Sequence, residues 1–517
     1  MARVGRSYPV PQHLRHNLPA VQGRQYAAAK SYGSAADWSP VNKSINDLIR
    51  SSAVPVRAKV RQLVRDFPYF TRAQNNLVDF IVGTGMTFQS RVRNPDYDPA
   101  KKSQNKFDKK SQQKIEDAVS WAYDELDITG RQHGRELERL SKRQDVECGE
   151  FLFIKKWDRT PGRYLPYALQ AVEADWLTDF GAKVAAGNKL DQGIEYNLVT
   201  GKTVAYHFTD PDGWGRTLRV LAADVIHGFD TKRPGQLRGI SDLVSGVLVA
   251  HDLSDYMDST FDTAKMASKY LALVTTADPA GRQLGAGMQT DAETGKKLDH
   301  LENAIVEYLR PGETMQFANA STVSDAFDPV TKLILRMFCV SSGVPYSLIS
   351  GDYSGLNYTV LRGERNDFAK ILRAPIARHI RQLPMVITRD VIDLAVLHGK
   401  LDLPGYYNNP HHYRRAVWIP DGMEPIDPLK ESKANRDDIA SGLRSPQEIV
   451  AKRGRDIEDV LNEIEDFKQM CADRGLTFEQ GSTALANNPA ALDAADDRSI
   501  NAALIEILDQ VQGLKEE

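Results

Sequence analysis

A glycine- and proline-rich loop that stops at the start of a long proline-free segment constrains this chain most. The loop, IHGFDTKRPGQLRGIS, runs from Ile226 to Ser241, and no proline occurs between it and about Tyr270. Glycine and proline mark loops, whereas a run of about thirty residues without proline favours one continuous helix. At ~1.5 Å per residue, such a helix spans about 45 Å, which few small domains can cover. The pattern predicts a wide body that continues into a narrow stem.

The predicted long helix, 240–270, has an apolar stripe and a row of aspartates. An amphipathic helix buries its stripe against a neighbour, so we expect this helix to pack against other helices. A strand–helix–strand unit follows, with strands in LALVTT, IVEYL and ETMQFA and a short helix in AETGKKLDHLENA. Ser324 then caps a second helix, 326–342. The stripe comprises Ile240, Leu243, Val244, Val247 and Leu248, and the acids are Asp242, Asp252, Asp255, Asp258 and Asp262.

Elsewhere helical and strand patterns alternate, which predicts an α+β fold that is mainly helical. Residues 1–45 are polar and contain four prolines, so we expect an irregular arm. Between 150 and 230 the period changes to that of short strands, in FLFIKKW, ALQAVEADWL, GIEYN, VAYHF and LRVL. Helices are predicted at 55–66, 69–82, 114–126, 134–148, 358–397 with breaks at Pro375 and Pro384, 427–473 with a break at Gly442, and 500–511.

Length and composition limit the class of protein. The 517 residues indicate several structural regions, and the 41% hydrophobic and 26% charged contents are those of a soluble protein. No apolar run approaches the roughly 18 residues of a membrane span, and residues 1–20 contain no apolar core of a secretory signal. The three cysteines, Cys148, Cys339 and Cys471, are too far apart for a zinc pattern or a disulfide framework, which favours a reducing compartment.

Charge is distributed unevenly along the chain. The net charge is −3, so the chain is not a generally basic nucleic-acid binder. Residues 1–60 hold nine Lys/Arg and two Asp/Glu, a balance of +7, whereas residues 418–517 hold eleven and twenty-two, a balance of −11. A basic arm and an acidic end indicate either different partners at the two ends or ordinary solvated tails.

The sequence contains no catalytic signature. GKT at Gly201–Thr203 lacks the first glycine of a phosphate-binding loop, and its position between two strand patterns predicts a hairpin turn at Thr200-Gly201. His411 and His412 adjoin Pro410 without a partner at metal-ligand spacing, and a loop is expected there. GxSxG and HExxH motifs are absent. We therefore predict a protein that is not an enzyme and has no cofactor and no metal site.

The loop SGVPYSLISGDYSGLNYT is the strongest functional candidate. It places three glycines and three tyrosines between two helices. Glycine permits reshaping, and tyrosine and asparagine touch a polyanion without holding it by charge. This composition suits a mobile loop that contacts DNA weakly, although an ordinary connection between helices remains open. The candidate DNA-contacting residues are Asp352, Tyr353, Ser354, Asn357 and Tyr358, and nearby Arg362, Arg365, Lys370 and Arg373 meet either phosphates or acidic neighbours.

Read in order, several segments resemble the lambda-type (siphovirus-like) bacteriophage portal protein family. The resemblance spans roughly residues 50–475, and the order and spacing of the blocks are more specific than any one block. The blocks are FIVGTGMTFQ (80–89), CGEFLF (148–153), VEADWL (172–177), VIHGFDTKRPGQLRGIS (225–241), SSGVPYSLISGD (341–352), NYTVLRGERNDF (357–368) and IDPLKESKANRDDIASGL (426–443).

The resemblance implies a portal fold of wing, stem, clip and crown, assembled as a ring that is expected to be a dodecamer. Carried over by segment, residues 1–45 are a flexible basic arm, 46–238 and 359–417 the wing, 239–270 and 320–343 the two stem helices, 271–319 a small α/β clip, 344–358 the tunnel loop, 418–480 the crown, and 481–517 an acidic linker with a short helix.

The resemblance also implies a function. A portal ring occupies one vertex of the capsid in the virion, is assembled in the host cytoplasm, and passes double-stranded DNA during packaging and ejection. Expected partners are further copies of the chain, DNA in the channel, the large terminase subunit at the clip, a head–tail adaptor, and the major capsid and scaffold proteins, with no membrane. Two alternatives stay open: a DNA-processing nuclease of phage origin and a head–tail adaptor without a channel.

Overall fold

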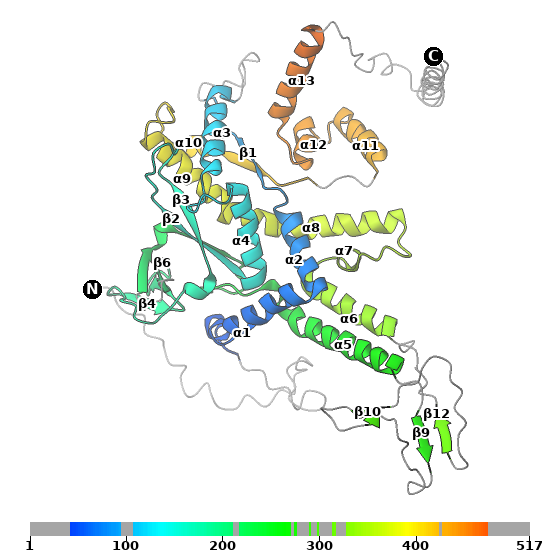
Figure 1. Cartoon of the computed structure of the whole chain (residues 1–517). Coiled ribbons are helices and arrows are strands. Elements are labelled where there is room, and N and C mark those ends of the chain that lie inside the picture. Colours follow the sequence, from blue (N-terminus) through cyan, green and yellow to red (C-terminus); the bar gives the residue numbers. More distant parts are fainter. Residues whose placement is uncertain are drawn as a thin grey trace, which may run out of the picture. The chain divides into compact units, whose positions relative to one another are not determined.

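A computed structural model describes most of the chain as a mixture of helices and sheets (Figure 1), which confirms the predicted combination of the two. It describes residues 42–94, 107–209, 217–269, 327–422 and 427–473, with short stretches at 273–276, 289–290, 297–298 and 313–316. Residues 1–41 of the predicted arm, the predicted strand IVEYL and the predicted helix at 500–511 lie outside the described residues.

The chain divides into two compact units, each built from two segments. The first unit comprises Met1–Val78 and Glu125–Val386, and the second comprises Asp79–Asp124 and Ile387–Glu517. Helices α2 (Pro68–Ile81) and α9 (Pro384–Leu397) run from one unit into the other.

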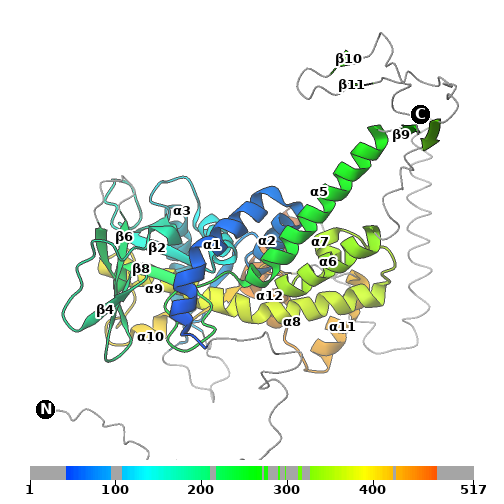
Figure 2. The ribbon, with the colours of Figure 1, turned by 90° about the horizontal axis from the view of Figure 1, so that it is seen from below.

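The first unit contains the stem candidates and most of the strands. In Figures 1 and 2, α6 lies between α5 and α8. Its helices are α1 (Ile45–Asp66), α4 (Gly134–Cys148), α5 (Val247–Lys269), α6 (Phe327–Ser342), α7 (Tyr346–Ser350) and α8 (Tyr358–Gln382), with 3-10 turns η4 (Ala174–Trp176), η5 (Ala222–Asp224) and η6 (Asp242–Gly246).

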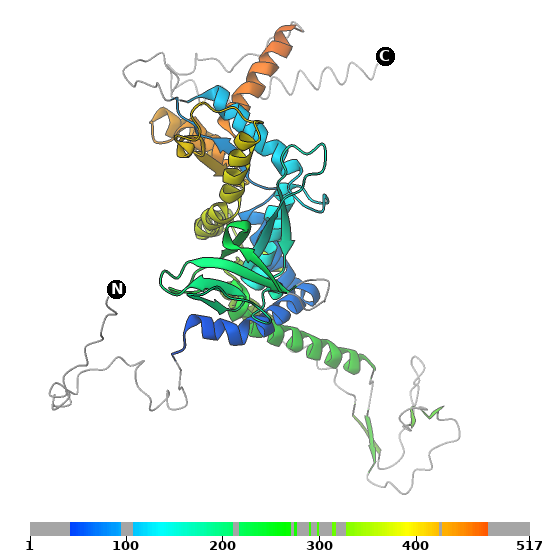
Figure 3. The ribbon, with the colours of Figure 1, turned by 90° about the vertical axis from the view of Figure 1, so that its left-hand side faces the viewer.

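Two antiparallel sheets form the strand-rich part of this unit (Figure 3). One has the order β3-β2-β8, and the other has the order β4-β5-β6-β7. Between β5 and β6, Gly201 has a φ of 69°, which confirms the predicted hairpin and leaves no phosphate-binding loop. The strands are β2 (Glu150–Lys156), β3 (Ala168–Val172), β4 (Asn188–Asp191), β5 (Ile194–Asn197), β6 (Thr203–Thr209), β7 (Thr217–Leu221) and β8 (Val225–Phe229).

The alternation of strand residues produces the core of these sheets. Leu152 and Ile154 of β2, Val172 of β3 and Phe208 of β6 belong to one buried apolar cluster. Side chains two residues apart share a face of a sheet, so each strand contributes every second residue to this core. The cluster also contains Cys148, the last residue of α4, so the C-terminal end of this helix packs against the sheet residues.

Short strand pairs occur in the segment predicted to be a strand–helix–strand unit. β9 (Leu273–Thr276) and β12 (Glu313–Gln316) lie in the predicted strands LALVTT and ETMQFA, and they pair antiparallel with each other. β10 (Gln289–Thr290) pairs with β11 (Lys297–Leu298). Residues 297–298 are therefore in a strand, so the short helix predicted there is wrong at this point.

The second unit combines a small sheet with helices. β1 (Thr87–Ser90) pairs antiparallel with β13 (Ala416–Ile419), and Trp418 packs on Phe88 and Tyr123. Gly442 has a φ of 69° between two helices, so the break predicted there is confirmed. The helices of this unit are α3 (Lys109–Asp124), α10 (Pro410–Tyr413), α11 (Pro428–Ala440), α12 (Pro446–Lys452) and α13 (Ile457–Asp473), with most of α9.

Several predicted boundaries need correction because packing overrides local signals. α1 begins at Ile45, capped by Ser44, and continues through Pro55, because its buried stripe includes Ala53 and Arg57 on either side of the proline. α8 likewise continues through Pro375, which was predicted to break it. Residues 411–412 lie in the short helix α10, where a loop was expected.

The long stem helix also starts later than predicted. Residues 242–246 form a 3-10 turn capped by Ser241, and the α-helix begins only at Val247. A Cβ at Gly246 would lie 2.3 Å from the Ser341 Oγ, so α6 presses directly on this turn. Among the helices of the described ranges, none is both long enough and apolar enough to cross a bilayer.

Candidate functional site

The loop before the stem helix is fixed by a buried arginine–glutamate pair. Arg238 Nε donates to both carboxylate oxygens of Glu150, at 2.9 Å each. Its other nitrogens donate to the carbonyls of Gln192, at 2.8 Å, and Ala174, at 2.9 Å. The Gly239 N–H also donates to Glu150, at 2.9 Å. One guanidinium therefore joins β2, the β4–β5 turn, η4 and the start of the stem.

Further polar groups surround the same carboxylate. His227 Nε2 lies 3.1 Å from Glu150, and its Nδ1 lies 3.2 Å from the Tyr206 hydroxyl. Arg57 of α1 lies 3.8 Å from Glu150 and 2.7 Å from Asp175. Burial acts to raise the pKa of Glu150, but the charge of Arg238 and the hydrogen bond from His227 outweigh it and hold that pKa well below its usual range. The carboxylate is therefore ionised inside the protein.

Two glycines allow the backbones to meet at this point. Gly149 ends α4 with a φ of 82°, a conformation that favours glycine. A side chain at either position would clash with the other segment. A Cβ added at Gly239 would lie 2.0 Å from the Gly149 carbonyl oxygen, and a Cβ added at Gly149 would lie 1.9 Å from the Ile240 carbonyl carbon. Ser241 Oγ then donates to the Val146 carbonyl, at 2.6 Å. The close approach of the two backbones requires a glycine in each segment, Gly149 in CGEF and Gly239 in RGIS.

A second charged cluster, partly exposed, attaches α8 to the same region. Arg378 lies 2.6 Å from Asp230, 3.8 Å from Asp145 and 3.9 Å from Asp242. Neighbouring His379 is buried, and burial lowers its pKa to about 3, so it is neutral near pH 7. The C-terminal part of α8 is thereby fixed on α4 and on the loop before the stem.

The candidate loop is more ordered than its composition predicts. Residues 346–350 form helix α7, and Gly351 ends it with a φ of 71°. The Leu348 carbonyl accepts from Arg72, at 2.6 Å, and from Asn76, at 3.1 Å, both on α2. Ser347 Oγ donates to Glu364 of α8, at 2.6 Å. Only 351–357 remains a connection, so the expectation of one loop over 344–358 is wrong in its first half.

The five predicted DNA-contacting residues have different local roles. Asp352 accepts hydrogen bonds from the backbone and hydroxyl of Ser354, and these bonds lower its pKa. Asn357 caps α8 by accepting from the Val360 N–H, at 2.9 Å. Tyr358 is already the first residue of α8. Tyr353 is 48% exposed at the tip of the connection, which makes it the member best placed to touch a ligand.

The predicted cations form one face of α8. Arg362, Arg365, Lys370 and Arg373 are all exposed. No described residue forms an ion pair with any of the four. The structure brings the cations together on one helix but does not show what they meet, so their contact with DNA stays a prediction.

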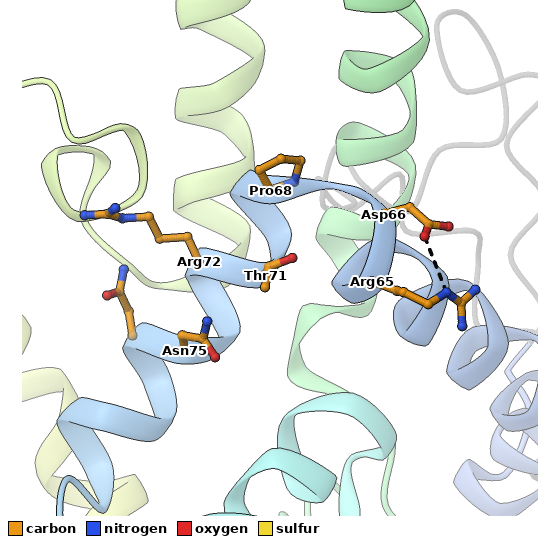
Figure 4. Close-up of a pocket in the computed structure, with 7 residues that line it drawn as sticks. Arg65, Asp66, Pro68, Thr71, Arg72 and Asn75 are labelled. Atoms are coloured by element: carbon orange, nitrogen blue, oxygen red, sulfur yellow. Dashed lines mark hydrogen bonds and ion pairs between the residues drawn. The ribbon is translucent and has the colours of Figure 1, made fainter.

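A polar pocket beside α7 was not predicted from the sequence. Figure 4 shows Arg65, Asp66, Pro68, Thr71, Arg72 and Asn75 around it, where α1 ends and α2 begins. Its volume is about 550 Å³. Its Arg72 also holds α7, so the pocket and the tunnel-loop candidate share a wall. In the described ranges, no group of three or more His, Cys, Asp or Glu side chains could hold a metal ion.

These features define a mixed fold of helices and sheets, with a strand-rich part, two neighbouring helices, α5 and α6, and a short connection between α7 and α8. Residues 32–374 match the phage portal protein, lambda family. That match covers more than half of the 517 residues, so the chain belongs to the lambda family of phage portal proteins. The resemblance seen in the sequence is confirmed, and with it the function as a portal protein and the location in the virion. The family is one of structural proteins.

Named relatives agree with this assignment. The probable portal protein of Halomonas phage phiHAP-1 is 26% identical over 353 residues, which are 65% of this chain and 65% of that protein. Portal protein B of Escherichia phage lambda is 21% identical over 482 residues, 85% of this chain and 89% of its own. The portal protein of Escherichia phage N15 is 21% identical over 471 residues, covering 83% and 86%.

Solved structures with a similar chain come from gene transfer agent particles. One is described as the neck of an empty GTA particle computed with C6 symmetry, with a TM-score of 0.44, 14% identity and coverage of 81% of this chain and 95% of that chain. Another, the neck of a native GTA particle computed with C12 symmetry, has a TM-score of 0.42, 12% identity and coverage of 75% and 91%.

Proposed function

We propose that copies of this chain form a closed ring, expected to be a dodecamer, whose channel passes double-stranded DNA during packaging and ejection. One observation carries the proposal: an apolar stripe of α6 has no partner within the described chain. Leu333, Met337 and Val340 are 58%, 53% and 84% exposed, at the i, i+4, i+7 spacing of one helix face. A contiguous apolar face of this kind marks a protein interface.

The proposed parts of the ring follow the segments named above. The strand-rich body is the wing, α5 and α6 are the stem, and the β9–β12 region within 271–319 is the clip. The crown, 418–480, contains α11 to α13. We propose that the large terminase subunit docks on the clip, with a head–tail adaptor at the same end, and that the major capsid and scaffold proteins contact the outside of the ring.

The portal performs no chemistry in this proposal, and its loop acts on DNA by contact alone. The connection 351–357 lies between the stem and α8, and Tyr353 is its exposed aromatic side chain. Tyrosine contacts the sugar–phosphate backbone without charge, so DNA can slide past it. A terminase ATPase would drive that movement.

Negative-stain imaging and native mass measurement of the purified protein test the ring. We expect a ring with a central channel, and we expect Leu333→Ser, Met337→Ser and Val340→Ser together to shift it toward monomers. The matched control replaces Leu198 and Val199, which are 61% and 92% exposed on the β5–β6 hairpin, by serine. A wild-type protein that stays monomeric at all concentrations, or a triple variant that assembles normally, refutes the proposal.

The two alternatives have their own assays. Cleavage of plasmid DNA in the presence of Mg²⁺ would support a nuclease. A ring without an open channel in the images would support a head–tail adaptor.

A further inference from the structure

Two charged helix faces on opposite sides of α6 are complementary in sign, number and length. The first is the basic face of α8, formed by Arg362, Arg365, Lys370 and Arg373. At 100° per residue these four positions lie within about 140° of one another, and they extend over about 17 Å of helix. All four side chains are exposed, and within the described parts of the chain none of them has an ion-pair partner.

The second is the acidic face of α5, formed by Asp252, Asp255, Asp258 and Asp262. These positions lie within about 120° of one another and extend over about 15 Å. All four are exposed. The other side of α5 carries the buried residues Ala250 and Leu253.

The existing partners of this acidic face are local and solvent-exposed. His251 lies 3.3 Å from Asp255 and 4.0 Å from Asp252, and Lys265 lies 3.1 Å from Asp262. Exposed pairs between near neighbours in one helix contribute little to stability, so they exchange readily for a better-placed partner. The face is therefore available to four cations from another molecule.

We infer that the basic face of α8 in one subunit contacts the acidic face of α5 in the next subunit. The inference rests on the proposed ring and names the surfaces that close it. α6 lies between the two helices (Figures 1 and 2), so the helices that carry the two charged faces lie on either side of α6. Different faces in contact make a heterologous, head-to-tail interface, which repeats around a ring, whereas a twofold dimer would use one face twice. The stripe of α6, Leu333, Met337 and Val340, supplies the apolar part of the same interface.

The charges also set the register between neighbours. Complementary charge guides association and excludes wrong pairings more than it adds affinity. Two acidic faces or two basic faces would repel each other, so the arrangement disfavours face-to-face dimers. It also predicts that assembly weakens as salt rises, because exposed charges are screened beyond about 8 Å at 0.15 M ionic strength.

Charge reversal tests the pairing in the full chain. One variant carries Arg362→Glu, Arg365→Glu and Arg373→Glu, and a second carries Asp252→Lys, Asp255→Lys and Asp258→Lys. We expect each variant alone to need at least about tenfold more protein for half-assembly, measured by mass photometry, since three repulsive contacts replace attractive ones. The control for the first variant is Lys109→Glu, Lys110→Glu and Lys433→Glu, which lowers the net charge by the same amount at exposed positions of α3 and α11 and should assemble as the wild type does.

Mixing distinguishes a lost contact from a damaged fold. In an equimolar mixture the reversed α8 of one variant meets the reversed α5 of the other, and the two unaltered faces meet as well. Mixed rings should therefore form at wild-type concentrations, as should rings of the protein with both reversals. A misfolded variant could not be rescued in this way.

Each remaining outcome decides against the inference. Normal assembly by either variant alone overturns it, and so does failure of both the mixture and the double reversal. If the variant reversed on α8 assembles normally but loses binding to a short fluorescent DNA duplex, the cations belong to DNA instead. A wild-type protein that forms no ring refutes the proposed function itself, and that result is obtained before any variant is tested.

Discussion

Replacing Arg238 by methionine tests whether one buried pair holds the start of the stem. The change removes the three bonds to Glu150 and the bonds to the Gln192 and Ala174 carbonyls, and leaves a buried carboxylate with less compensation. Breaking a buried ion pair on one side costs about 3–5 kcal/mol. At roughly 2–4 °C per kcal/mol for a large domain, we expect the midpoint of thermal unfolding to fall by roughly 6–20 °C.

The assay is urea and thermal unfolding followed by circular dichroism at a concentration where the protein is monomeric. The control is Arg50→Met, which removes a pair with Asp191 in which the arginine is 53% exposed, so the midpoint of thermal unfolding should fall much less than for Arg238→Met. Replacing both partners, with Glu150→Gln added to Arg238→Met, should cost less than the sum of the single changes, because no charge stays unpaired.

The dependence of the free energy of unfolding on pH provides a second test of the Glu150–Arg238 pair. In the wild type the pKa of Glu150 is depressed, so its contribution to stability is present above the unfolded value near ~4.3 and is lost as pH falls toward the folded value. Without Arg238 we expect burial to raise that pKa, so the variant should lose less stability as pH falls from 8 to 5. A loss no larger than that of Arg50→Met, with no such pH dependence, refutes the reasoning.

Three further predictions concern the loop and the clip. Asn357→Ala should cost about 1 kcal/mol through loss of the α8 cap, seen as faster hydrogen exchange at 358–362, while Asn357→Asp keeps the cap and should not. Tyr353→Ala should leave ring recovery unchanged but lower DNA content per capsid, and normal filling would show that this side chain does not act on DNA. Deleting 277–298 should abolish pull-down of the cognate large terminase subunit while rings persist, and undiminished binding would count against docking at the clip.

Local signals in the sequence predict some elements to the residue. Helix 134–148 is found as predicted, because a capping box of His133 and Glu136 begins it and Gly149 ends it. The hairpin at Gly201 also follows from a local pattern, a turn signal between two strand-like runs. In each case the determining residues lie close together in the chain.

Contacts between distant residues explain what the sequence did not predict. The turn before α5 brings Gly246 against Ser341, nearly a hundred positions away in the chain, and no signal in the sequence predicts that contact. The first half of the tunnel loop is helical because Leu348 is held by Arg72 and Asn76. The Glu150–Arg238 pair joins two blocks that the sequence shows only as separate motifs. The composition of the sequence predicted a connection at 351–357. It did not predict that Asn357, one of the candidate site residues, caps α8.

The distribution of burial along α5 has a consequence for how a subunit behaves before assembly. Val247, Ala250 and Leu253 are buried, whereas between 254 and 265 no residue is. The distal turns are supported by Tyr256 and Phe261 on Phe327 and by little else among the described side chains. A helix with so little packing has low local stability, so its amides should open independently of the body. The free subunit would then carry a fraying stem that becomes fully helical only when neighbours dock, which couples the last step of folding to ring closure and keeps unassembled copies conformationally distinct from finished ones.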